Sequence, residues 1–90
     1  MNEYKYKFTD GEMVADLRAF GLRVEERDIE KNSGQMVSLM RMWMVYNPGS
    51  RRWVPAVRVY TALLGEGFKR AALGGINRLD IINILKNNRL

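Results

Sequence analysis

The sequence of 90 residues predicts a small two-layer α+β domain, with an N-terminal helix, an antiparallel β-hairpin or three-stranded meander, and C-terminal helices. Apolar residues recur at helical spacing near both ends of the chain, whereas β-branched and aromatic residues fill its middle. Two turn signals, at residues 32–34 and 47–50, divide that middle into segments of strand length. Because the length suits one hydrophobic core, we expect a single domain over residues 1–90.

The first helix has the clearest local signal. Thr9 and Glu12 are placed as the N-cap and third residue of a capping box, in which each side chain accepts from the backbone N–H of the other residue. Apolar residues then follow at helical spacing, and Gly21 can adopt the left-handed conformation that ends a helix. We therefore expect a helix near residues 10–20.

The middle segment, residues 36–46, allows two interpretations. Its apolar residues fit an i, i+3, i+4 stripe, which would make the protein an all-α bundle of roughly four to five short helices. The alternative is a hairpin, because β-branched and aromatic residues lie on both sides of the turn signal at residues 47–50. In that turn, Pro48 and Gly49 suit the central positions of a type II turn. We favour the hairpin.

A hairpin with a four-residue loop at 47–50 would place Tyr46 opposite Arg51. One face would then be almost wholly apolar, carrying Met40, Met42, Met44, Trp53, Pro55, Val57 and Val59. The opposite, mixed face would carry Val37, Leu39, Arg41, Trp43, Val45, Arg52, Val54, Arg58 and Tyr60. A half-buried antiparallel sheet shows this division, so we expect the apolar face in the core. Pro55 leaves a second possibility, a helix at residues 55–64, because proline cannot donate to a β-ladder.

Two flanking segments complete the expected fold. Residues 24–31 are either a charged edge strand, paired through the turn at residues 32–34, or one helical turn. Near the C-terminus we expect a helix at residues 78–87, with Asn77 as its N-cap. The apolar face of this helix, expected in the core, consists of Leu79, Ile81, Ile82 and Leu85.

The composition narrows the classes of function. Cysteine is absent, so the chain has no disulfide or thiolate metal site, and a reducing compartment is favoured. Histidine, the commonest side chain for proton transfer near neutral pH, is absent too. We therefore expect no enzymatic activity, no cofactor and no metal. The charged N-terminus and the lack of a long apolar run predict neither a signal peptide nor a membrane span, so we expect a cytoplasmic protein.

The net charge of +5 is unevenly spread along the chain. Residues 1–40 hold six basic and eight acidic side chains, a net charge of −2. Residues 41–60 hold four arginines and no acid, and residues 61–90 hold five basic and two acidic side chains, a net charge of +3. Such asymmetry suits a nucleic acid or an acidic protein surface, although many small domains carry a similar charge for solubility alone.

The mixed face of the expected hairpin is the first candidate binding site. Arg41, Arg52 and Arg58 would offer hydrogen-bond donors to phosphates, and Trp43 and Tyr60 would offer flat rings on which bases can stack. The alternative is structural: the two aromatic rings would pack under a helix, and the arginines would only solvate an outer face.

The second candidate is the segment Gly65-Glu66-Gly67, followed by Lys69 and Arg70, because glycines before a basic helix start can present N–H groups to a phosphate. The order of helix, strands, Gly-Glu-Gly and Lys-Arg resembles double-stranded RNA-binding domains, whose last helix begins with basic residues that hold phosphates. The resemblance covers about a dozen residues and ends at Gly74-Gly75, where the family's helix continues, so we do not assign the chain to that family.

These features favour a small basic module that binds DNA or RNA through its phosphate backbone, using residues 41–60 and 67–70. The alternative is a protein-interaction adaptor or inhibitor of viral or mobile-element type, which docks its basic face on an acidic partner. A third possibility is a subunit of a homo-oligomer. We expect four methionines in the core, although they could form an adaptable binding groove instead: Met36, Met40, Met42 and Met44.

Overall fold

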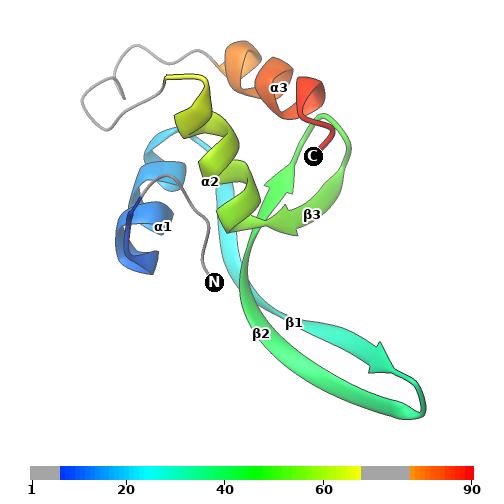
Figure 1. Ribbon diagram of the computed structural model, residues 1–90. Coiled ribbons are helices and arrows are strands. Elements are labelled where there is room, and N and C mark those ends of the chain that lie inside the picture. Colours follow the sequence, from blue (N-terminus) through cyan, green and yellow to red (C-terminus); the bar gives the residue numbers. More distant parts are fainter. Residues whose placement is uncertain (1–6, 68–77) are drawn as a thin grey trace.

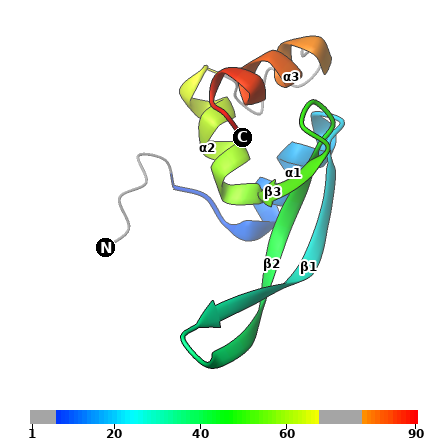
Figure 2. The same cartoon turned by 90° about the vertical axis from the view of Figure 1, so that its right-hand side faces the viewer.

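The computed structural model describes residues 7–67 and 78–90. Its elements are α1 (Asp10–Ala19), β1 (Arg23–Ser33), β2 (Met36–Asn47), β3 (Arg52–Pro55), α2 (Ala56–Gly65) and α3 (Arg78–Asn87). The strands form one antiparallel sheet in the order β1-β2-β3, so the predicted small α+β domain with a three-stranded meander is confirmed. The helices gather at one end of this sheet, and the rest of β1 and β2 projects from them as a two-stranded ribbon (Figures 1 and 2).

Helix α1 begins and ends as the sequence predicts. The Thr9 hydroxyl accepts from the Glu12 N–H at 3.1 Å, and the Glu12 carboxylate accepts from the Thr9 N–H at 2.8 Å. At the other end, Gly21 has a φ of 91°, and the Leu22 N–H donates to the Leu17 carbonyl at 3.1 Å. This bond spans the left-handed glycine, as in a Schellman motif, and it turns the chain into β1.

The hairpin between β2 and β3 exists, but its predicted register is wrong. Tyr46 lies opposite Trp53, not opposite Arg51, and Asn47 lies opposite Arg52. The four-residue loop therefore covers residues 48–51, one position later than expected. Each residue of β2 thus pairs with a residue two positions later in the chain than predicted. Because side chains change face at every residue, a shift of two positions leaves each side chain on its predicted face.

The loop conformation explains the new register. Gly49 does not have the positive φ that a type II turn requires, whereas Arg51 has a φ of 60° and donates its N–H to the Asn47 carbonyl at 2.7 Å. The Asn47 side chain also accepts from the Gly49 N–H at 2.9 Å. Asn47 is thus the last paired residue of β2, and its backbone carbonyl and side chain both accept hydrogen bonds from the loop.

The helices cover the mixed face of the sheet, so the prediction that the apolar face forms the core is wrong, although Met44 of that face is buried as predicted. Val45 and Val54 are buried on this face, and Val24 of β1 lies opposite Val45 and is buried with them. On the other face, the β1 residue opposite Met44 is Glu25. Strand β1 therefore decides which face packs under the helices, because it adds Val24 to one face and the carboxylate of Glu25 to the other.

Strand β3 ends at Pro55, and the residues after it form α2. The helical alternative suggested by that proline is therefore correct, and the prediction of a strand through residue 60 is wrong. The four residues that the hairpin interpretation placed on a sheet lie on this helix: Val57, Arg58, Val59 and Tyr60. Of these, Val59 and Tyr60 are buried, while Arg58 is exposed.

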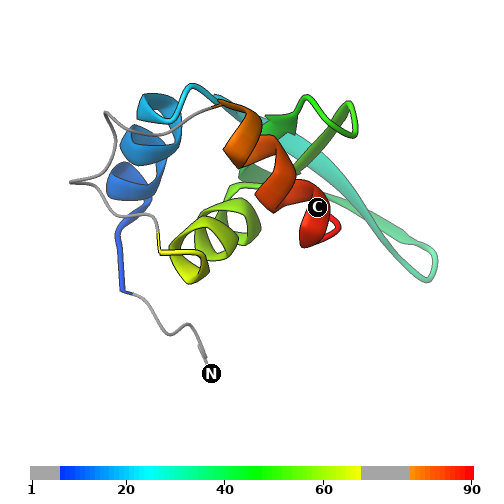
Figure 3. The same ribbon diagram turned by 90° about the horizontal axis from the view of Figure 1, so that it is seen from above.

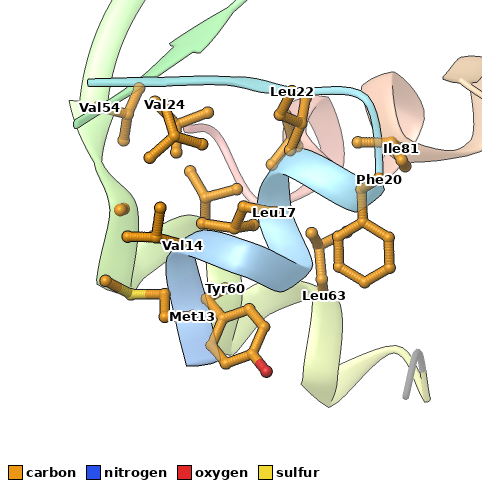
Figure 4. Close-up of a cluster of buried hydrophobic side chains, with 14 residues drawn as sticks. Met13, Val14, Leu17, Phe20, Leu22, Val24, Val54, Tyr60, Leu63 and Ile81 are labelled. Carbon is orange, nitrogen blue, oxygen red and sulfur yellow. The ribbon is translucent and has the colours of Figure 1, made fainter. Parts of the chain in front are cut away.

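Side chains from all six elements meet in one core (Figure 4). Its buried members are Met13, Val14, Leu17, Phe20, Leu22, Val24, Val45, Val54, Ala56, Val59, Tyr60, Leu63, Ile81 and Leu85. The Tyr60 hydroxyl donates to the buried carboxylate of Asp16, which ties α2 to α1. The ring of Phe8 packs edge-on against that of Tyr60, with centroids 4.7 Å apart.

Helix α3 has the predicted bounds and buries Ile81 and Leu85 completely. The prediction that Leu79 also packs in the core is wrong, because this side chain is 67% exposed. At 100° per residue, Leu79 lies on the far side of the helix from Ile81. The predicted N-cap, Asn77, lies outside the described residues.

Candidate functional site

The structure does not assemble the predicted basic-aromatic face. Tyr60 is buried in the core on α2 and offers no ring to a ligand, and Arg58 lies on the same helix rather than on the sheet. Trp43 does lie on β2, but it packs half-buried against the core, with the Arg18 guanidinium 5.8 Å from the centre of its ring. These side chains therefore do not share one exposed surface.

Arg41 lies on the projecting ribbon, among carboxylates of the neighbouring strand. Its guanidinium is 3.5 Å from the Glu26 carboxylate and 3.9 Å from that of Asp28. Both partners belong to β1, and all three side chains are exposed. The charge of Arg41 is thus balanced within the ribbon, which makes it a poor contact for phosphate.

The segment Gly65-Glu66-Gly67 closes α2 instead of opening a basic helix. The N–H groups of Glu66 and Gly67 donate to carbonyls in the last turn of α2 at 3.0 to 3.2 Å, and Gly67 has a φ of 94°. The prediction that this segment presents N–H groups to a phosphate is wrong for these two residues, because their donors are already bonded. Lys69 and Arg70 lie outside the described residues.

A different cationic surface lies where the β2–β3 loop, α2 and the end of α3 meet. We call it the C-terminal basic surface, and it consists of five exposed side chains, Arg51, Arg52, Arg58, Lys86 and Arg89. The sequence contains no acidic residue between positions 47 and 65 or between 81 and 90. Within residues 7–67 and 78–90, none of the five cations is in an ion pair, so their charge is unbalanced by neighbours.

One hollow on this surface joins the loop to α3. Its lining combines apolar residues of α3 and the chain end, Ile82 and Leu90, with polar side chains, among them Ser50 of the loop and Asn83 and Lys86 of α3. The Asn47 side-chain amide fixes this arrangement by donating to the Leu90 carbonyl at 2.7 Å. In Figure 1 the C-terminal end of the chain lies beside the β2–β3 loop, as this bond requires. A hydroxyl, an amide and an ammonium group thus border one small depression, and together they can donate to a tetrahedral anion.

A second hollow continues the surface onto α2. Arg58 and Thr61 of α2 line it together with Asn88 and Leu90 from the end of the chain. Leu90 borders both hollows, so the two depressions adjoin. Viewed from above, the end of α3 lies between α2 and the β2–β3 loop (Figure 3). Lys86 lines the first hollow and Arg58 lines the second. The other three cations of the surface are next to, or one residue beyond, lining residues in the sequence: Arg51, Arg52 and Arg89.

Another group of aromatic and basic side chains occupies the sheet face turned away from the helices. The rings of Tyr46 and Trp53 are 5.5 Å apart, and the guanidinium groups of Arg23 and Arg27 lie 5.1 and 4.3 Å from the centre of the Trp53 ring. Glu25 pairs with both arginines, at 2.8 and 3.5 Å. These two arginines stack on Trp53 and are neutralised by Glu25 of their own strand, in contrast to the cations of the C-terminal basic surface.

The outer ribbon exposes apolar side chains. Residues 30–41 are all exposed, and the prediction that Met36 and Met40 lie in the core is wrong, since they are 73% and 43% exposed. Leu39 and Val37 are 70% and 61% exposed. None of the described helices covers this part of the sheet (Figure 2), so strand alternation buries neither of its faces.

Comparisons with protein-family models, with curated proteins and with solved structures found no match to this chain. None of the helices in the described residues is long and apolar enough to cross a membrane.

Proposed function

We propose that the protein is a non-enzymatic cytoplasmic module that binds the phosphate backbone of DNA or RNA through its C-terminal basic surface. One observation carries the proposal: five exposed cations, on segments that border two adjoining hollows, have no ion-pair partner among the described residues. The other arginines of the sheet, Arg23, Arg27 and Arg41, are all paired with carboxylates. Within the described residues, these five cations have no ion pair to break when they meet a phosphate.

The side chains of this surface suit phosphate better than base edges. Arginine binds phosphate oxygens through two parallel N–H groups, and Arg52 and Arg58 are exposed enough to do so. Lys86, Asn83 and Ser50 border one hollow, where a single phosphate can receive an ammonium, an amide and a hydroxyl donor. Among the residues that the structure describes, this surface includes no projecting helix or strand that would enter a groove, so we propose little direct reading of bases.

The test is the salt dependence of binding, measured by fluorescence anisotropy with labelled duplex DNA and duplex RNA. Replacing Arg52, Arg58 and Lys86 by glutamine removes three cations that are exposed and lie outside the core. If each cation meets one phosphate, the slope of log affinity against log salt falls in magnitude by about 2 to 3 units. Affinity at low salt should fall as well.

The matched control replaces Arg23, Arg27 and Arg41 by glutamine, which removes the same total charge from residues that are paired within the sheet. The proposal predicts that this control keeps most of the wild-type slope. Equal losses in the two triple variants would show that only net charge matters and would overturn the assignment of the surface. Wild-type protein that binds neither nucleic acid at low salt would overturn the proposed function and favour an acidic protein partner instead.

A further inference from the structure

The projecting ribbon has two edges, and their chemistry differs. In β1, residues 23–31 carry seven charged side chains in nine positions. In β2, residues 36–43 carry only Arg41. Charged side chains along an edge strand prevent it from pairing with another chain. The β1 edge is therefore protected, whereas the β2 edge is not.

The outer part of β2 also lacks a pairing partner on one side. Among the described strands, β3 pairs with β2 only from Met44 to Asn47. The eight residues before Met44 are bonded to β1 on one side and have an open backbone edge on the other. This open edge is bounded by β3 at one end and by the turn at Gly34 at the other. It has the length of an ordinary strand.

This segment exposes large apolar side chains to solvent. Four large apolar residues between positions 36 and 40 are 43% to 73% exposed, and the segment has no proline or glycine to weaken a strand. A two-stranded ribbon is marginally stable in water unless a further strand or layer packs on it. Contiguous exposed apolar side chains next to an open strand edge are typical of a protein-interaction surface.

We propose that this edge pairs with the same edge of a second copy of the chain. The two β2 strands would run antiparallel about a two-fold axis at Leu39, giving a four-stranded sheet in the order β1-β2-β2-β1. The proposal is independent of nucleic-acid binding, because it concerns the opposite end of the molecule. It commits to a homodimer with an isologous interface, in which the same patch serves both partners.

The charge pattern of this edge suits pairing with a second copy. With Leu39 at the axis, Arg41 lies opposite Val37 of the second copy, and Met36 lies opposite Met42. No like charges meet, because Arg41 is the only charge in the segment, and Glu26 and Asp28 already balance it. This edge is thus complementary to itself.

The same operation on the β1 edge would be unfavourable. A two-fold axis at Arg27 would place this arginine opposite itself and Glu26 opposite Asp28 of the second copy. Like charges directly opposite one another destabilise a strand pair. The ribbon therefore offers one edge that fits its own copy and one that rejects it.

The first test is the mass of the full-length protein in solution, measured by sedimentation equilibrium over a range of concentrations. The wild-type chain should dimerise, and Leu39→Glu should weaken the dimer by at least about thirtyfold, because two glutamates would face each other across the axis, each beside Glu30 of its own chain. Asn32→Glu is the matched control. It adds the same charge to an exposed position of the ribbon, but on β1, and should leave the dimer unchanged.

A second test uses the absence of cysteine from the chain. Leu39→Cys should form a disulfide-linked dimer on mild oxidation, since residues directly opposite in an antiparallel pair are within disulfide reach. Glu30→Cys, which lies opposite Leu39 on β1, should not crosslink comparably. A wild-type protein that is monomeric at all concentrations, a dimer that resists Leu39→Glu, or equal crosslinking of the two cysteine variants would each overturn the proposal.

Discussion

The inner and outer halves of the sheet are made by the same strands, yet they have opposite surroundings. In the inner half, Val24, Val45 and Val54 pack under the helices and are buried. In the outer half, Met36 and Leu39 of the same β2 strand are 73% and 70% exposed. Apolar side chains are present in both halves, so hydrophobicity alone does not define the core. The helical layer does, and it covers only one end of the sheet.

The sheet and the C-terminal basic surface also differ in how their charges are arranged. Arginines of the ribbon and of the outer sheet face pair with carboxylates on β1. At the helical end, the C-terminal basic surface has no such partner among the described residues. The helical end is therefore suited to an anionic ligand, and the ribbon is suited to another protein strand.

The largest expected effect comes from truncating a leucine in the core, compared with truncating a leucine on the exposed ribbon. Leu63→Ala should lower the free energy of unfolding by about 2 to 5 kcal/mol, because Leu63 is completely buried and a cavity would remain. Leu39→Ala should change it by no more than about 0.5 kcal/mol in the monomer. Urea unfolding at low protein concentration measures both values, and similar losses would show that the ribbon is not an uncovered part of the sheet.

A smaller effect is expected from the hydrogen bond that joins α1 to α2. Tyr60→Phe removes the donor to the buried Asp16 carboxylate and should cost about 1 to 3 kcal/mol. Tyr46→Phe is a matched control on the sheet face turned away from the helices, where the ring is half-buried. It should lower the free energy of unfolding by less than about 0.5 kcal/mol. If the two tyrosine variants unfold at the same urea concentration, the bond between the helices contributes little.

The smallest effect concerns the start of α1. Thr9→Ala removes the hydroxyl that accepts from the Glu12 N–H and should lower the free energy of unfolding by about 1 kcal/mol. Thr9→Ser keeps an acceptor at the same position and should stay near the wild-type value. Thermal unfolding of the three proteins compares them, and a Thr9→Ser variant as unstable as Thr9→Ala would argue against the capping box.

Features that depend on neighbouring residues could be predicted from the sequence. The capping box of Thr9 and Glu12, the helix end at Gly21 and the bounds of α3 each follow from a few adjacent positions. The alternation of β2 and β3 was also predictable, because side chains on a strand change face at every residue. The start of α2 stayed ambiguous, since residues 57–60 suit a strand as well as a helix.

Features that depend on distant residues could not be predicted. The choice of core face depends on Val24 meeting Val45 across β1 and β2, which the β2–β3 hairpin alone does not contain. The C-terminal basic surface depends on α3 packing against the β2–β3 loop, where Asn47 bonds to Leu90. The sequence signals for this surface were the cationic composition of residues 41–90 and the lack of acidic residues in both segments, and neither signal shows that the two segments meet.

The measurement that tests the central claim most directly is a titration of the protein with a short nucleic-acid duplex, followed residue by residue through backbone amide chemical shifts in NMR. If phosphate binds at the C-terminal basic surface, the amides of Ser50, Arg52 and Lys86 should shift, and those of residues 30–40 on the ribbon should stay in place. Shifts confined to the ribbon, with none around the two hollows, would contradict the account.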